Sequence, residues 1–393
     1  MTLSQRRFYG LDIIKMMRKV SVNRILIYCL LFICGIELSE NCFKNILFLI
    51  LIIIAGEKYN MASNFTTKMN LANFTCKFGE KYVMLDLFEQ VVFPAFMENR
   101  IRTFGDASYS FLDQQIAKFD DDEVCLCGRL VKDTIVERSQ IMVDGKIVED
   151  HKSMESAPTS FFVLLLSNHK LLYVRESPGA PSLSSFTSTI SLFLGDAYKE
   201  WIRTVYDNKK NNNKKITWKA LYSQIPPPKV TVTPMSSEDS VSAFIEKFKA
   251  VNAIEVRVLE TNHELDNSPI FGEMREIKEL IGADNMLLRS QKSGAVGLDK
   301  ANLAKLISSQ AGDGNTEVTI KGTAINGEKI TAKDDSFSIA IVISKLPKNV
   351  LSAAGKVYEK LKNQLSLGIV SIKPSGSAAI SKVGSIIKAR TWG

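Results

Sequence analysis

The chain has 393 residues, of which 45% are hydrophobic and 23% are charged, and its formal net charge is +8. These values are typical of globular proteins and exclude wholesale disorder. Six scattered cysteines do not form a disulfide framework, and no phosphate-loop or zinc-hydrolase motif is present. The sequence therefore limits the possible classes of protein but does not identify an activity. It favours a non-enzymatic protein without a cofactor.

Residues 1–60 differ from the rest of the chain because they hold two apolar runs, 25–36 and 46–55. Neither run reaches the roughly 18 to 20 residues that a membrane-spanning helix requires. The codons of residues 55–57 (Ala-Gly-Glu) can contain a bacterial ribosome-binding sequence, and Met61 follows at a workable distance. We therefore interpret 1–60 as a translated leader of a bacterial, cytoplasmic protein. The alternative is a signal or anchor segment of a membrane-associated protein.

Residues 61–207 are predicted to form an α+β domain with an antiparallel sheet. A buried helix is expected at 81–97, kinked or ended near Pro94. Two hairpins follow, the first joining 134–143 to 146–150 through Asp144-Gly145 and the second joining 160–166 to 171–176. Apolar residues then recur at helical spacing from Leu183 to Val205, which predicts one long helix packed on the sheet.

A basic linker is predicted at 208–228. Residues 207–215 contain no apolar residue, and residues 226–228 are three consecutive prolines. Such a segment cannot contribute to a core, so a domain boundary is expected here.

An elaborated ferredoxin-like domain is predicted at 229–373, followed by a basic flexible tail at 374–393. Its first unit is a strand at 229–233, a helix capped by Ser236 or Ser237, and a strand at 254–259. The simplest arrangement of this unit is β-α-β with parallel strands, which suggests the split β-α-β sandwich.

The rest of this domain is expected to contain three helices and three strands. Helices are predicted at 271–281, 299–310 and 348–365, with a glycine-rich loop at 290–297. Strands are predicted at 317–325 and 337–344, on either side of the hairpin signal Asn326-Gly327, and at 368–372.

The residues that bind metals in proteins are not grouped in this sequence. His151, His169 and His263 do not stand at metal-ligand spacing, and surface or turn roles are expected for them. Cys125 and Cys127 would lie on the same face of a strand, where core packing is the expected role. The sequence predicts no metal site.

Two basic regions carry the main functional indication. Residues 199–229 hold eight Lys or Arg against two acidic residues, and 345–393 hold nine against Glu359 alone. In the first region tryptophans and tyrosines alternate with lysines, a combination that pairs phosphate neutralisation with base stacking. The candidate nucleic-acid-binding residues are Lys209, Lys210, Lys214, Lys215, Trp218, Lys219, Lys356, Lys360, Lys382, Lys388 and Arg390.

These observations predict a protein that contacts DNA or RNA mainly through phosphates, in a host-defence or mobile-element setting. Two other classes stay open. One is a protein-interaction or assembly subunit, including a homo-oligomer, in which the helix at 183–205 and exposed strand edges contact the partner. The other is a membrane-anchored protein that uses the apolar segment at 25–55.

Overall fold

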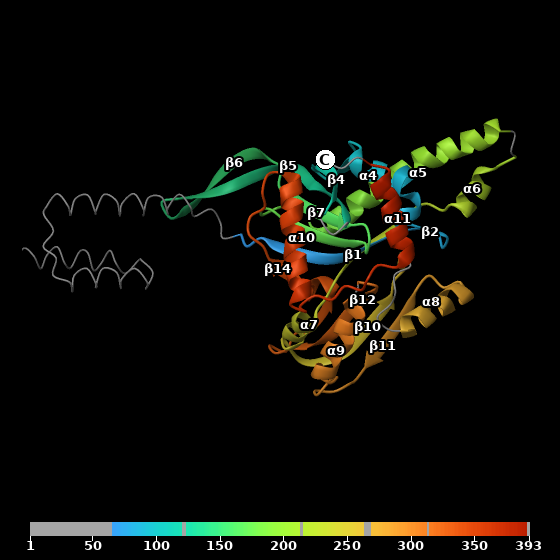
Figure 1. Cartoon of the computed structure of the whole chain (residues 1–393). Helices are drawn as coiled ribbons and strands as arrows, with labels where there is room; N and C mark the ends of the chain where they lie inside the picture. The colour runs from blue at the N-terminus through green and yellow to red at the C-terminus, as the bar shows by residue number, and fades with distance from the viewer. Residues whose placement is uncertain (1–64, 120–122, 213–214, 263–268, 313, 391–393) are drawn as a thin grey trace, which may run out of the picture. The chain divides into compact units, whose positions relative to one another are not determined.

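The computed structural model describes residues 65–119, 123–212, 215–262, 269–312 and 314–390 (Figure 1). They belong to one compact unit, Phe65–Gly393. The predicted leader at 1–60 lies outside the described residues. The described residues form two antiparallel sheets and the helices that cover them, which confirms the predicted α+β class. Among these residues no helix combines the length and apolarity needed to cross a membrane.

The first sheet is built around β1 (Lys68–Phe78), which pairs with strands from distant parts of the chain. The strand order is β14-β1-β8-β7-β5-β4-β3, with β2 and β9 also paired to β1 and β6 paired to β5. Every pair is antiparallel. The other strands are β2 (Tyr82–Val83), β3 (Ile101–Phe104), β4 (Ala107–Lys118), β5 (Val124–Val143), β6 (Lys146–Ser156), β7 (Thr159–Leu165), β8 (Lys170–Arg175), β9 (Lys229–Pro234) and β14 (Ala340–Val342).

One face of this sheet is covered by a long helix, α5 (Leu183–Asn211), as the periodicity predicted. Ser182 caps α5 by accepting the N–H of Ser185 at 3.1 Å, which satisfies a free amide of the first turn. The helical turns η1 (Met84–Leu87) and η2 (Phe88–Val92), with α4 (Phe93–Met97), complete this layer. Pro94 lies in the first turn of α4, where its missing N–H costs no hydrogen bond.

The opposite face of the sheet is covered by α10 (Val350–Ser366). Its buried residues are spaced three or four apart, as expected for one helical stripe: Val350, Ala353, Ala354, Val357 and Leu361. Cys125 and Cys127 of β5 are buried in the same layer, which confirms the packing role predicted for them. Burial raises the pKa of the Cys125 thiol.

The second sheet has the order β11-β10-β12-β13 and its own hydrophobic core. Its strands are β10 (Phe248–Val258), β11 (Met286–Gln291), β12 (Thr316–Ala324) and β13 (Lys329–Lys333). Its helices are α7 (Glu238–Ile245), α8 (Pro269–Ile281) and α9 (Lys300–Ala311). Ser237 caps α7, and α8 and α9 occupy the positions predicted for helices.

The parallel β-α-β unit predicted at 229–259 is wrong. β9 pairs with β1 in the first sheet, whereas β10 pairs antiparallel with β11 and β12 in the second. The two strands on either side of α7 therefore belong to different sheets. The ferredoxin-like arrangement depended on this unit and is not proposed for the chain. Because β9, β14 and α10 also pack with strands of the first half, the segment 208–228 does not separate two sheets.

Three further predictions fail near the C-terminus. Strands at 317–325 and 337–344 were predicted on either side of the Asn326-Gly327 turn. In the structure β12 pairs across this turn with β13, and β14, which lies in the second predicted range, pairs with β1 of the first sheet. No strand forms at 368–372. The predicted flexible tail contains a helix, α11 (Ser377–Lys388), whose Val383 and Ile386 are buried against the α5 layer. The apolar stripe of this helix is short, and only contact with the core makes it stable.

Candidate nucleic-acid interface

The basic segment after α5 folds as a helical hairpin. α5 ends at Asn211, and a short helix, α6 (Trp218–Gln224), follows (Figure 1). Thr217 caps α6 by accepting the N–H of Ala220 at 3.2 Å, and Leu221 is buried in the core of the first sheet. Leu221 therefore anchors α6 to the core of the first sheet, while the other residues of this helix are exposed.

An aromatic stack runs along this hairpin. The rings of Tyr206 and Trp218 lie 4.0 Å apart at an angle of 12°, and the ring of Tyr222 stacks on Trp218 at 5.9 Å. Trp218 is 37% exposed and Tyr222 is 41% exposed. Trp201, by contrast, is packed against the core. The hairpin therefore presents two preorganised aromatic rings to the solvent.

Lysines of the predicted site surround this stack in the sequence. Lys209 and Lys210 lie in the last turn of α5, Lys215 precedes α6, and Lys219 lies in its first turn. None of these four forms an ion pair with another described residue. Lys214 lies outside the described residues. The described residues of the predicted site between 209 and 219 thus all lie in the α5–α6 hairpin.

Two of the C-terminal candidates do not join this surface. Lys356 and Lys360 lie on α10, which covers the face of the sheet opposite to α5 and α6. The Nζ atom of Lys356 donates to the carbonyl oxygen of Lys345 at 2.9 Å. Lys388 is exposed near the end of α11.

Two of the C-terminal candidates form ion pairs that hold α11 in place. Arg390 donates to both carboxylate oxygens of Glu89 at 2.7 and 2.8 Å, and its guanidinium lies 4.6 Å from the ring centre of Phe93. The Nζ atom of Lys382 lies 2.5 Å from Asp86. These contacts give Arg390 and Lys382 structural roles that their position in a basic tail did not indicate.

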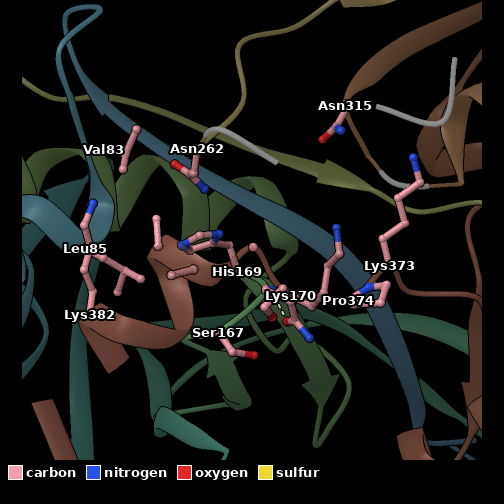
Figure 2. Close-up of a pocket in the computed structure, with 15 residues that line it drawn as sticks. Val83, Leu85, Ser167, His169, Lys170, Asn262, Asn315, Lys373, Pro374 and Lys382 are labelled. Atoms are coloured by element: carbon pink, nitrogen blue, oxygen red, sulfur yellow. Dashed lines mark hydrogen bonds between the residues drawn. The ribbon is translucent and has the colours of Figure 1, made fainter. Parts of the chain in front are cut away.

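A polar cluster that the sequence did not predict lies where the two sheets and α11 meet (Figure 2). Asn73 of β1 donates from Nδ2 to the Oδ1 atom of Asn315 at 3.0 Å and accepts the Nζ of Lys170 at 3.0 Å. Asn262 holds the edge of β1 by bonding the N–H of Cys76 and the carbonyl of Phe74, at 2.9 and 2.8 Å.

His169 belongs to the same cluster. It has a positive φ of 58° in the turn between β7 and β8, as a turn role predicted, but only 2% of it is exposed, so the surface role is wrong. The sequence of β1 contains one indication of this buried polar cluster. On one side of β1 the apolar residues Met69 and Leu71 give way to buried polar ones, Asn73, Thr75 and Lys77.

A partly buried ion network links β1 to the second sheet beside this cluster. The carboxylate of Glu260 accepts the Nζ of Lys77 at 3.0 Å and also bonds the Nζ of Lys278 on α8. Burial alone would raise the pKa of Glu260, but the hydrogen bonds from Lys278 and Lys77 outweigh it and lower the pKa to about 2. Glu260 is therefore ionised at neutral pH, and it couples the two sheets.

Metal binding has no support among the described residues, where no three His, Cys, Asp or Glu side chains are grouped in a way that would hold an ion. His263 lies outside the described residues.

Comparison with known proteins adds no relative: no protein-family model matches the chain, and no curated protein matches its sequence.

Proposed function

We propose that the protein binds single-stranded DNA or RNA through the α5–α6 hairpin, without catalysing a reaction on it. The observation that carries this proposal is the Tyr206–Trp218–Tyr222 stack, in which the rings of Trp218 and Tyr222 are exposed. The stack is placed among Lys209, Lys210, Lys215 and Lys219. Aromatic rings stack on any base, and lysines neutralise phosphates, so binding is expected to be strongly salt-dependent and weakly sequence-dependent.

The test is a salt titration of binding by fluorescence anisotropy, with single-stranded DNA and RNA of mixed sequence. Each phosphate contact should contribute about −0.7 to the slope of log K against log salt concentration. We expect Lys209→Gln, Lys210→Gln, Lys215→Gln and Lys219→Gln combined to reduce this slope. The matched control removes four exposed lysines elsewhere, Lys249, Lys305, Lys329 and Lys348. Equal loss in both variants, or no salt-dependent binding to either nucleic acid, would exclude the hairpin as the site.

A second candidate function is self-assembly, and a different observation favours it. Beyond Thr134, β5 pairs only with β6, so the two strands form an arm that extends away from the sheet (Figure 1). Met142 and Ile147 are paired across this arm, and they are 75% and 70% exposed. Such paired apolar side chains with free strand edges fit a second copy of the same arm.

Light scattering after gel filtration tests this second candidate. A dimer that Met142→Ser with Ile147→Ser converts to a monomer supports assembly through the arm. A wild-type monomer at all concentrations excludes it. The apolar stripe of α5, which the sequence offered as a partner surface, is already buried by the chain itself.

A further inference from the structure

We propose that two copies of this protein assemble through one face of the β5–β6 arm, with the two arms antiparallel and face to face. The proposal rests on self-assembly, the second candidate function above, and it adds the face, the orientation and the charge pairing of the contact. The arm is accessible for such a contact because it leaves the first sheet beyond Thr134 and ends at the Asp144-Gly145 turn (Figure 1).

Alternation along the strands defines two faces of the arm. Neighbouring residues of a strand lie on opposite faces, and residues directly opposite in an antiparallel pair share a face. The pairing shifts once, between Arg138 and Gln140, where the extra residue belongs to β6, so the alternation along β5 is not interrupted. One face, face A, therefore contains four cross-strand pairs: Val136–Met154, Arg138–Lys152, Gln140–Glu149 and Met142–Ile147.

Face A carries exposed apolar side chains at both of its ends. Met142 and Ile147 next to the turn are 75% and 70% exposed, and Met154 and Val136 near the sheet are 66% and 48% exposed. The two ends lie about 20 Å apart, since six residues separate them along β5 and each adds about 3.3 Å. A partner that removes these side chains from water would stabilise the arm.

The two polar pairs between these ends differ in charge. Arg138 and Lys152 both contact the carboxylate of Asp150, which leaves one net positive charge on the side of face A nearer the sheet. Glu149 places one negative charge on the side nearer the turn, and it forms no ion pair with another described residue. From the sheet to the turn, face A is therefore apolar, positive, negative and apolar.

This order is complementary to itself under a two-fold rotation. We consider an axis that runs across the strands at Ser139, between the two arms. The rotation places each apolar pair of one protomer over the apolar pair at the opposite end of the other protomer, as in an isologous contact. It also places Lys152 of one protomer over Glu149 of the other, and symmetry repeats this ion pair. One rotation thus covers both apolar ends of face A and matches its charges.

The other face of the arm does not match a second copy in this way. The same rotation would place the carboxylate of Glu137 over Ile141 of the other protomer, which would remove a charge from water without a partner. The cross-strand pairs of this face are Ile135–Glu155, Glu137–Ser153, Ile141–Val148 and Val143–Lys146. The distribution of charge therefore selects face A.

Exchange of two charges in the full chain tests the proposal, with the dimer dissociation constant measured by analytical ultracentrifugation at low salt. Glu149→Lys and Lys152→Glu should each raise this constant about tenfold, because each turns two symmetric attractions into repulsions. The double variant, and an equimolar mixture of the two single variants, should recover the wild-type value. Glu137→Lys on the other face is the matched control and should leave the constant unchanged.

Cysteine cross-linking tests whether the arms meet face to face. Val136→Cys combined with Met142→Cys should give a covalent dimer on mild oxidation, because the rotation places each of these positions over the other across the two protomers. Ile135→Cys combined with Val143→Cys, on the other face, is the control and should cross-link far less. Only a face-to-face contact brings both β5 strands and both β6 strands together, so edge-to-edge pairing would satisfy one of the two tests but not both.

The arrangement is overturned if the double charge variant stays as weak as the single variants, or if the face A cysteines cross-link no more than the control pair. Self-assembly through the arm would still stand in that case, provided that Met142→Ser with Ile147→Ser converts the dimer to a monomer. A wild-type monomer at all concentrations overturns both the arrangement and the assembly function.

Discussion

The side-chain amide of Asn73 donates to the Oδ1 atom of Asn315 at 3.0 Å, and this hydrogen bond joins residues that are 242 positions apart in the sequence. Both residues are buried, Asn73 in the first sheet and Asn315 directly before β12 of the second. Gly314 makes the approach possible. Its φ is +72°, and a Cβ atom there would lie 2.6 Å from the Cβ of Asn73. The two sheets therefore meet through specific polar contacts.

Removal of this hydrogen bond should destabilise the protein. Asn315→Ala leaves the buried amide of Asn73 without this acceptor, which should cost about 1 to 3 kcal/mol in the free energy of unfolding. Urea unfolding measures the loss. The control is Asn326→Ala in the β12–β13 turn, where the amide is exposed and the expected change is within about 0.5 kcal/mol. Equal stability of the two variants would contradict a structural role for the Asn73–Asn315 bond.

Glu260 should make stability fall in acid. Its folded pKa of about 2 lies below the ordinary value of 4.5 for a glutamate, so the folded state holds the carboxylate more strongly in its ionised form. The stabilisation is present above pH 4.5 and is lost as the pH falls towards 2. After allowance for partial exposure we expect a loss of about 2 kcal/mol. Unfolding midpoints between pH 5 and pH 2 measure it, and Glu260→Gln should show a weaker pH dependence in this range.

Asp334 should act in the opposite direction at higher pH. Burial raises its pKa to about 7, although it accepts the N–H of Val318 at 3.0 Å. The folded state therefore binds the proton more tightly, and stability falls as the pH rises from about 4 to 7. Asp334→Asn keeps an oxygen acceptor and cannot ionise. We expect it to be about 1 to 3 kcal/mol more stable than the wild type at pH 8 and close to it only below about pH 4. A wild-type advantage at pH 8 would refute this assignment.

Trp218 should contribute to nucleic-acid affinity through stacking. Trp218→Ala is expected to weaken single-strand binding by about 1 to 3 kcal/mol per stacked base. Trp218→Phe retains a ring and should recover part of the affinity. Because Trp218 also packs on Tyr206 and Tyr222, the unfolding midpoint should fall more in the alanine variant than in the phenylalanine variant, and affinities are compared well below both midpoints. Similar affinity in the alanine and phenylalanine variants would show that charge alone carries binding.

The packing of α11 can be tested with two isoleucines on the same helix. Ile386 is buried against the α5 layer, whereas Ile380 is 57% exposed. Ile386→Ala should cost about 2 to 5 kcal/mol, and Ile380→Ala should cost less than about 1 kcal/mol. Thermal unfolding compares the two. Equal and small effects would restore the view of 374–393 as a loosely attached tail.

The sequence by itself determined the local elements, because their signals lie within a few residues. The periodicity from Leu183 to Val205 predicted α5, Asp144-Gly145 predicted the β5–β6 turn, and Ser237 marked the start of α7. The α5–α6 hairpin also kept Lys209, Lys210 and Trp218 together, since they are neighbours in the chain.

Only the tertiary structure decided which strands pair and where the buried polar groups meet. The unit at 229–259 has the local pattern of β-α-β, but β9 completes the free edge of β1 and β10 opens a second sheet, a choice made by long-range pairing. Similarly, Asn73, Lys170 and Asn315 are unremarkable separately, and the apolar stripe of α11 is too short to predict a helix. Their roles depend on contacts between residues that are far apart in the sequence, 97 positions for Asn73 and Lys170 and 242 for Asn73 and Asn315, which no local pattern records.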